Sequence, residues 1–407
     1  MTKTAVIAYS GGLDTTYCAA WLREQGYAVH TVLVQTGGFD AGELAAIERR
    51  ARQLGAVEHV AIDARDELFN DYLRFLIYAN ALRGGVYPLC VSAERVVQAK
   101  RVAQYADAIS ADAIAHGSTG AGNDQVRFDA AFRVLAPGAT VLTPIRRQAL
   151  SRRDETAWLA ERGINVPEKT SRYSINRGLW GATIGGVETH RSDGVLPEEA
   201  YLLTASPDRR PTEAECVQID FDRGVPVRLN GEPLAPVALI EQLASAAARH
   251  GVGRGMHVGD TILGIKGRVA FEAPAAVTLI AAHRELEKLV LSRQQLFWKA
   301  TLGDLYGAML HEARFFDQLM RDLEAFLASS QRRVTGTAAV RLHQGQAIVE
   351  GVNSPFSLMD PDLAVYGEES SMWSGEEAAA FSKLYGLADA LGQRAAAKED
   401  SHAALGR

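Results

Sequence analysis

The stretch Ala8-Tyr9-Ser10-Gly11-Gly12-Leu13-Asp14-Thr15-Thr16 decides the fold, because it joins a buried strand to a helix through a glycine pair. The apolar run at 5–8 predicts a parallel strand, and apolar residues at helical spacing predict a helix over 14–24. Gly11 and Gly12 allow a tight turn whose N–H groups reach an anion beside the positive end of that helix. The stretch therefore predicts a phosphate-binding loop, with an ordinary strand-turn-helix joint as the alternative.

The spacing of this loop excludes two common phosphate-binding motifs. A Walker A loop requires Gly-x-x-x-x-Gly-Lys-Ser/Thr and a dinucleotide fingerprint requires Gly-x-Gly-x-x-Gly, and neither pattern is found here. Instead, Ser10-Gly11-Gly12-Leu13-Asp14-Thr15 resembles the loop of the ATP pyrophosphatases, which cleave ATP between the α- and β-phosphates. This resemblance implies where ATP is cleaved. It leaves the substrate open, since the superfamily includes amidotransferases, tRNA-modifying enzymes and ligases.

The composition is that of a globular protein with room for two domains, with 407 residues of which 47% are hydrophobic and 23% charged. The net charge of −6 argues against a broad nucleic-acid surface, so a tRNA substrate is disfavoured. Cys18, Cys90 and Cys216 form no Cys-x-x-Cys pair, so we predict no disulfide framework and no metal site. We expect the protein to be located in the reducing cytoplasm. No run of about 18 apolar residues and no signal peptide is recognisable, so we expect no membrane partner.

Strand and helix patterns alternate through the first part of the chain. Further strands are predicted at 29–34, 57–62 and 113–115, and helices at 43–54, 67–82 and up to about 106. This alternation predicts a doubly wound parallel α/β sheet. The resemblance of the glycine loop implies that it is an ATP-pyrophosphatase (adenine nucleotide alpha hydrolase-like) domain. Ser151 and Asp154 form a capping-box pattern that opens one more helix. We therefore place the nucleotide-binding domain at residues 1–165.

The pattern changes after Pro167 to that of a second, α+β domain, which we place at 166–372. Two hairpins, 216–221 with 225–229 and 338–342 with 347–351, and helices at 236–249 and 281–291 are predicted there. The remainder, 373–407, is a helical tail with an apolar stripe of Ala380, Phe381, Leu384, Leu387 and Leu391. The stripe predicts docking either on a neighbouring subunit or on the same chain.

A second loop, His116 to Phe128, is rich in small and hydrogen-bonding residues, which suits a ligand with carboxylates and an amine. Its run His-Gly-x-Thr-Gly-x-Gly-Asn-Asp-Gln-Val-Arg-Phe resembles the argininosuccinate synthase family. Further matches at the family's spacing extend over nearly the whole chain: Tyr87 to Arg95, Tyr173-Ser174-Ile175, Leu179-Trp180-Gly181, His250 to Arg254, Gly264-Ile265-Lys266, Ser354-Pro355 and Ser357-Leu358.

This resemblance implies a two-step ligation in arginine biosynthesis or the urea cycle. The ureido oxygen of citrulline attacks the α-phosphate of ATP, pyrophosphate leaves with Mg²⁺, and the amine of aspartate then displaces AMP. Such chemistry depends on the grip on phosphate and the position of the amine. The resemblance also implies that residues 166–372 are the synthetase domain, that the C-terminal helix serves oligomerisation, and that the protein is a cytoplasmic homotetramer.

The family's functional residues carry over to matching positions of this chain. The implied ATP-binding residues are Ala8, Tyr9, Ser10, Gly11, Gly12, Leu13, Asp14, Thr15, Thr16, Val34, Arg95 and Gly117. The implied aspartate-binding residues are Thr119, Asn123 and Asp124, and the implied citrulline-binding residues are Tyr87, Ser92, Asn123, Arg127, Ser174 and Thr183. Among these, we assign catalytic importance to Ser10, Asp14, Asp124 and Arg127.

The acceptor end departs from the family pattern. Where the family has Val-Glu-Asn-Arg, this chain has Val258-Gly259-Asp260-Thr261, so the glutamate that faces citrulline's ammonium is absent. Phe271 replaces a tyrosine at the same end, and Thr183 replaces a serine. Because loss of one partner of a buried charge pair costs roughly 3 to 5 kcal/mol, we expect citrulline to be a poor acceptor unless Asp260 takes over. Further departures are Cys90, Val91, Ala121 and the segment Gln35-Thr36-Gly37-Gly38.

Three interpretations follow: an argininosuccinate synthase-type ligase, a specialised-metabolism ligase that joins aspartate to another acceptor, and a catalytically silent paralogue that binds ATP or aspartate. The intact loop Ser10 to Thr16 and the set Thr119, Asn123 and Asp124 favour an enzyme.

Overall fold

The computed structural model describes residues 2–166, 173–367 and 370–405. Within the chain, Met1–Phe356 forms one compact unit and Ser357–Arg407 a second. The sequence-based expectation of a mixed α/β fold is confirmed: a parallel sheet comes first, and antiparallel sheets follow.

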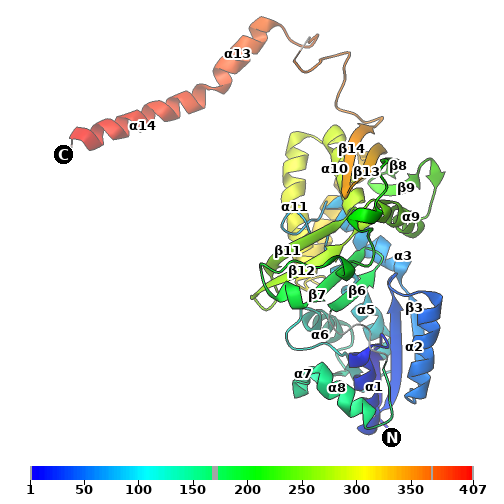
Figure 1. Cartoon of the computed structure of the whole chain (residues 1–407). Helices are drawn as coiled ribbons and strands as arrows, with labels where there is room; N and C mark the ends of the chain where they lie inside the picture. Colours follow the sequence, from blue (N-terminus) through cyan, green and yellow to red (C-terminus); the bar gives the residue numbers. More distant parts are fainter. Residues whose placement is uncertain (1, 167–172, 368–369, 406–407) are drawn as a thin grey trace. The chain divides into compact units, whose positions relative to one another are not determined.

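The parallel sheet has the strand order β3-β2-β1-β4-β5. Its strands are β1 (Thr4–Ala8), β2 (Ala28–Gln35), β3 (Glu58–Asp63), β4 (Ala113–Ala115) and β5 (Thr140–Leu142). The helices of this region are α1 (Leu13–Glu24), α2 (Ala41–Gln53), α5 (Ser92–Ala108), α6 (Asp124–Leu135), α7 (Pro144–Gln148) and α8 (Arg152–Ala160). Figure 1 shows the edge strand β3 of this sheet beside helix α2. Strand order reverses between β1 and β4, and ligands of open α/β sheets bind at the carboxyl ends of such strands.

Side chains of β1 are buried on both faces of this sheet, which explains its unbroken apolar run. Ala5 and Ile7 belong to a core shared with α1, α2 and α8, whereas Val6 belongs to the core on the side of α5 and α6. Successive residues of a strand point to opposite faces, so a strand covered on both sides must be apolar throughout. The capping box predicted at Ser151 and Asp154 is confirmed at the start of α8.

One predicted helix is divided. The segment predicted as a helix over 67–82 consists of α3 (Arg65–Leu68), a π-helical turn (Phe69–Leu73) and α4 (Arg74–Tyr78). It ends four residues early because Asn80 takes a left-handed conformation with φ of 48°.

Both predicted hairpins are confirmed and lie in one antiparallel sheet with the order β10-β9-β8-β13-β14. Its strands are β8 (Glu215–Asp222), β9 (Val225–Leu229), β10 (Glu232–Pro233), β13 (Gly336–His343) and β14 (Gln346–Asn353). The helices of this region are α9 (Pro236–Arg249), α10 (Pro274–Val290), α11 (Arg293–His311) and α12 (Gln318–Ser330). The predicted helix at 281–291 begins earlier, at Pro274, which suits the first turn because it needs no N–H partner there.

A third sheet, with the order β11-β12-β7-β6, has no counterpart among the predicted strands. It consists of β6 (Tyr173–Gly178), β7 (Gly181–Gly186), β11 (Arg254–Asp260) and β12 (Lys266–Glu272). Short 3₁₀ turns complete this unit at Val187–His190, Glu198–Ala200, Pro207–Arg209 and Gln331–Arg333. The β6–β7 turn meets the loop after β2, because Leu179 N donates to Thr36 O over 2.8 Å.

A buried polar network joins α10 and α11 to the end of α4. Lys299 Nζ lies 2.5 Å from Glu287 Oε2, and both side chains are almost fully buried. Glu287 also accepts from Gln331 Nε2 over 2.8 Å and from Asn80 Nδ2 over 2.6 Å. The left-handed turn at Asn80 is thereby fixed to the second half of the unit.

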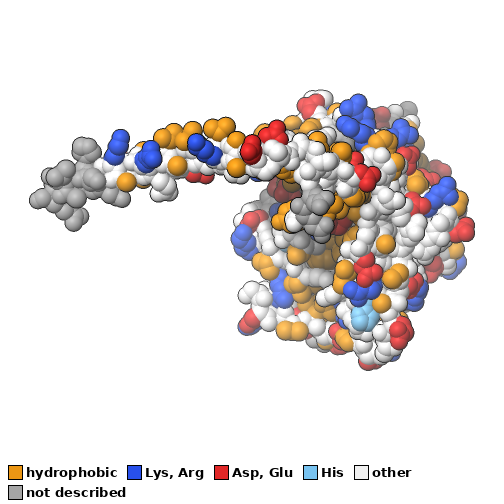
Figure 2. Space-filling view, turned by 90° about the horizontal axis from the view of Figure 1, so that it is seen from above, with side chains coloured by type: hydrophobic (Ala, Val, Ile, Leu, Met, Phe, Trp, Pro, Cys, Tyr) orange, Lys and Arg blue, Asp and Glu red, His pale blue; other side chains and the backbone are white. Residues whose placement is uncertain are grey.

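The second unit contains α13 (Gly375–Tyr385) and α14 (Leu387–Leu405), which are separated at Gly386. Ser374 and Glu377 form a capping box at the start of α13. The side chains of Phe381, Leu384 and Leu391 are 66%, 67% and 54% exposed, and Figure 2 shows hydrophobic side chains in a row along this segment. None of the helices in the described part of the chain has the length and hydropathy that crossing a bilayer requires.

Candidate active site

The glycine loop lies between the end of β1 and the start of α1. Gly11 has φ of +70°, and a Cβ on it would lie 2.9 Å from Ile47 Cγ1, so this position requires glycine. Arg50 Nη1 donates to Gly11 O, and Ser10 Oγ lies 3.3 Å from Thr15 Oγ1. Ser10 N donates to Thr15 Oγ1 over 3.4 Å, and the first helical bond of α1 runs from Thr16 N to Gly12 O. The N–H groups between them, at the start of α1, suit an anion.

Gly117 brings a second loop against this one. It follows β4, which pairs with β1, and a Cβ on Gly117 would lie 3.2 Å from both the Cβ and the carbonyl carbon of Asp14. The absence of a side chain at Gly117 therefore allows the two loops to meet at the carboxyl ends of β1 and β4. Val34 lies at the end of neighbouring β2, and Tyr9 N donates to Val32 O on that strand.

Two carboxyl groups meet at the glycine loop: that of Asp14, which is half-buried, and that of Glu155 of α8, which is buried. They are close enough for each to influence the pKa of the other. Burial and then the charge of Asp14 raise the pKa of Glu155 to about 8, so at neutral pH Glu155 retains a proton. Burial also raises the pKa of Asp14, against the charge of Arg152. The pair shares one negative charge beside the loop.

Asp124, at the start of α6, lies between two arginines. Arg95 Nε is 2.8 Å from its Oδ2, and Arg127 Nη1 is 2.9 Å from its Oδ1. Burial would raise the pKa of Asp124, but the charges and hydrogen bonds of Arg95 and Arg127 outweigh it and lower the pKa to about 2. Asp124 is therefore ionised throughout the physiological pH range, and it fixes both guanidinium groups.

Arg127 extends this cluster to the start of α5 and the end of α11. Its Nη2 donates to Ser92 Oγ over 3.3 Å and to His311 O over 2.9 Å. Burial and then the charge of Arg127 lower the pKa of His311 to about 3, so its imidazole stays neutral. Val91, which precedes α5, has φ of 76°, an unfavourable conformation for a β-branched residue.

The sheet β11-β12-β7-β6 presents one face to this cluster. Directly paired residues of antiparallel strands project from the same face. One face of the sheet, which we call the inner face, therefore carries four such pairs. They are Ser174 with Gly185, Asn176 with Thr183, Thr183 with Phe271, and Phe271 with Gly255. It lies against the arginine cluster, because Arg95 Nη2 donates to Asn176 Oδ1 over 2.6 Å, and against Tyr87, whose ring centroid is 5.3 Å from that of Phe271.

Thr119 and Asn123 lie in the loop before α6, and Asn123 directly precedes Asp124. Asn123 Oδ1 accepts from Ile262 N over 2.9 Å, which connects this loop to the turn between β11 and β12. Thr119 is exposed. Of the predicted aspartate-binding residues, Asp124 is the one whose side chain contacts Arg95 and Arg127 directly among the contacts of the described residues.

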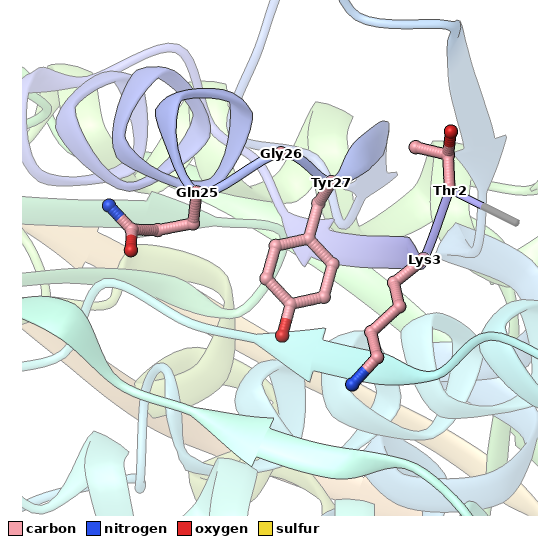
Figure 3. Close-up of a pocket in the computed structure, with 5 residues that line it drawn as sticks. All are labelled: Thr2, Lys3, Gln25, Gly26 and Tyr27. Atoms are coloured by element: carbon pink, nitrogen blue, oxygen red, sulfur yellow. The ribbon is translucent and has the colours of Figure 1, made fainter.

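A hollow elsewhere on the surface is lined by Thr2, Lys3, Gln25, Gly26 and Tyr27 (Figure 3). It lies at the amino end of β1 and the carboxyl end of α1, opposite to the glycine loop. None of the predicted site residues lines it.

Comparison with known proteins agrees with this arrangement. Residues 4–165 match the model of the arginosuccinate synthase N-terminal HUP domain, and residues 173–391 match that of the arginosuccinate synthase C-terminal domain. This chain belongs to the argininosuccinate synthase family. It is 42% identical over 388 residues to the argininosuccinate synthase of Methanocaldococcus jannaschii, which covers 95% of this chain and 97% of the relative. Identity to the argininosuccinate synthase of Geobacillus kaustophilus is 40% over 383 residues, with 94% of each chain covered. Identity to the argininosuccinate synthase of Rubrobacter xylanophilus is 40% over 386 residues, which covers 95% of this chain and 94% of the relative.

Two of the departures from the argininosuccinate synthase pattern, Gly259 and Phe271, lie on the edge strand β11 and its neighbour β12. A Cβ on Gly259 would overlap Nε2 of His257, and a Cβ on Gly255 would overlap the ring of Phe271. Asp260 Oδ1 lies 2.7 Å from Lys266 Nζ, and both side chains are largely exposed. The carboxylate of Asp260 thus already has a cationic partner.

Sequence reasoning missed several residues of this candidate site. Asn176 had a usable signal, because it lies two positions after Ser174 and so on the same strand face. Glu155 lies next to the capping residue Asp154, and its approach to Asp14 depends on tertiary packing. His257 and His311 lie outside every motif, and the fold alone brings them to Tyr87 and Arg127.

Proposed function

We propose that this chain is an ATP-dependent carbon–nitrogen ligase of the argininosuccinate synthase type. The ureido oxygen of the acceptor forms a bond to the α-phosphorus of ATP, and the bond to the β-phosphate oxygen breaks with release of pyrophosphate. The amine of aspartate then bonds to the ureido carbon, and the carbon–oxygen bond to AMP breaks. The products are AMP, pyrophosphate, a proton, and argininosuccinate or an analogue.

The observation that supports this function best is the meeting of the glycine loop with Gly117 at the carboxyl ends of β1 and β4. Free N–H groups at the start of α1 suit the phosphates of ATP, and the shared charge of Asp14 and Glu155 leaves the loop less negative than two carboxylates would. Among the described residues there is no cluster of three or more His, Cys, Asp or Glu side chains that could hold a metal. We therefore expect Mg²⁺ to enter as part of MgATP.

We assign ATP to residues 8–16, Val34, Arg95 and Gly117. Aspartate is assigned to Thr119, Asn123 and Asp124, and the acceptor to Tyr87, Ser92, Asn123, Arg127, Ser174 and Thr183. Stabilisation of charge during adenylation needs hydrogen-bond donors that are held in place before the reaction. Arg95 and Arg127 are such donors, because their ion pairs with Asp124 fix both guanidinium groups.

We further propose a homotetramer in the cytoplasm, without nucleic-acid or membrane partners. Its domains are residues 1–165, 166–372 and 373–407. The exposed apolar side chains of α13 and α14 favour contact with another subunit.

Pyrophosphate release tests this function. Purified protein is incubated with MgATP, aspartate and a panel of ureido and amide acceptors that includes citrulline, and each substrate is omitted in turn. We expect pyrophosphate in excess over enzyme only when ATP, aspartate and an acceptor are all present. ATP binding without pyrophosphate release for any acceptor would instead identify a catalytically silent paralogue.

A further inference from the structure

The inner face carries a histidine that the proposed function does not use. His257 lies on β11 two residues from Gly255, so it shares the face of Phe271, Thr183 and Ser174. Its ring stacks on that of Tyr87, with centroids 5.6 Å apart and an angle of 18° between the planes. His257 therefore lies at the acceptor end of the proposed site.

Two glycines make room for this imidazole. A Cβ on Gly84 would lie 3.0 Å from His257 Cε1, and a Cβ on Gly259 would overlap His257 Nε2. His257 thus occupies the space into which a side chain at position 259 would extend. Its Nε2 is buried and has no hydrogen-bond partner in the described part of the chain, so it is available to a ligand.

The charges around His257 are unfavourable for a cation. Burial and then the charge of Arg83 lower the pKa of His257. Arg127 and Arg83 act in the same direction on neighbouring His311. The carboxylates of this region have partners already, since Asp124 is bound by Arg95 and Arg127, and Asp260 by Lys266. A ligand ammonium here would lose water without gaining a counterion, whereas a carboxylate would meet cations and a neutral imidazole.

We propose that His257 determines acceptor specificity, and that it selects a ureido acid whose end distant from the ureido group carries a carboxylate and no ammonium. This inference rests on the proposed function and names the acceptor class of the same site. The neutral imidazole donates or accepts one hydrogen bond through Nε2, and Arg83 supplies the positive charge. An α-amino acid such as citrulline would bring its ammonium next to His257 and Arg83, where it has no counterion among the described residues, so the site disfavours it.

Two acceptors that differ only in the α-amine test the proposal: citrulline and 5-(carbamoylamino)pentanoic acid. The kcat/KM of each is measured by pyrophosphate release with saturating MgATP and aspartate. We expect the wild-type protein to prefer the acid without the amine by at least tenfold. A preference for citrulline would overturn this inference and leave the ligase function intact. Pyrophosphate release with another acceptor of the panel but with neither of these two would do the same, whereas no pyrophosphate with any acceptor would refute both.

Variants assign the preference to His257. His257→Ala should lose most of the preference, and His257→Ala combined with Gly259→Glu should reverse it, because the new carboxylate then has room and pairs with the ammonium of citrulline. His343→Ala, which changes a histidine on β13, should leave the ratio of the two kcat/KM values unchanged. If His257→Ala keeps the wild-type ratio while remaining active, His257 does not set specificity. The comparison of the two acceptors on the wild-type protein needs no variant and stands if a variant fails to fold.

Discussion

Comparison of alanine variants at Gly11 and Gly12 separates the contribution of the phosphate loop to folding stability from its contribution to ATP binding. Gly11→Ala places a non-glycine residue at φ of +70°, which costs roughly 1 to 2 kcal/mol. The new Cβ also meets Ile47 Cγ1 at 2.9 Å, and Ile47 is buried in the core beneath the loop. Insertion of a methyl group into a packed core adds about 1 to 3 kcal/mol. We therefore expect a loss of about 2 to 5 kcal/mol of folding free energy.

Gly12→Ala is the matched control. Gly12 has φ of −76°, which any residue adopts, and a Cβ on it would have only Ser10 Oγ, at 3.5 Å, as a neighbour within 4 Å. Its folding stability should therefore be nearly unchanged, while a methyl group on the phosphate side of the loop should raise the KM for ATP.

Thermal unfolding and pyrophosphate kinetics distinguish the two variants. At about 2 to 4 °C per kcal/mol for domains of 150 to 250 residues, Gly11→Ala should lower the Tm by several degrees and also reduce activity. Gly12→Ala should keep the wild-type Tm and lose ATP affinity. Equal Tm values for Gly11→Ala and Gly12→Ala would refute the assignment of the left-handed turn and its contact with Ile47.

Three further predictions follow from buried charges. Asp124→Asn should reduce the kcat/KM for aspartate much more than that for ATP, because it removes the carboxylate that we assign to aspartate; an equal effect on both substrates would contradict the assignment. Lys299→Met should lower the free energy of unfolding by about 3 to 5 kcal/mol in urea titrations, since Glu287 loses its cationic partner in the core, and Glu287→Gln in the same protein should restore part of that loss. The pKa of Glu155 is raised to about 8 from 4.5, so the folded protein keeps a proton that the unfolded chain releases. The free energy of unfolding should therefore fall between about pH 4.5 and pH 8, by at most about 1.4 kcal/mol per pH unit. Glu155→Gln should reduce this fall, and an unchanged pH dependence would contradict the protonated state of Glu155.

The sequence predicted well those parts of the fold that depend on neighbouring residues. The run before Gly11 predicted a buried strand because its apolar character has no period, and the capping box at Ser151 predicted the start of α8 because both partners lie within one turn. The two hairpins followed from turn residues and alternating patterns. In each case the decisive interaction joins residues a few positions apart.

The remaining features depend on tertiary contacts. No local pattern brings Asn176 to Arg95 or His257 to Tyr87, because these pairs are far apart in the chain and meet only when the sheet β11-β12-β7-β6 packs on the nucleotide-binding region. The early end of α4 is stabilised by the bond from Asn80 to Glu287, which lies more than 200 residues away. The helical tail is divided at Gly386 into α13 and α14, a break that the prediction from the sequence did not include.

Transfer of the ureido oxygen to AMP tests the central claim most directly. An acceptor labelled with ¹⁸O in its ureido group is incubated with MgATP, aspartate and the protein, and the products are analysed by mass spectrometry and ³¹P NMR. If the acceptor is adenylated, one ¹⁸O atom appears in the phosphate of AMP, and pyrophosphate forms in equal amount. ADP and inorganic phosphate as the stoichiometric products, or AMP without ¹⁸O, would contradict this account.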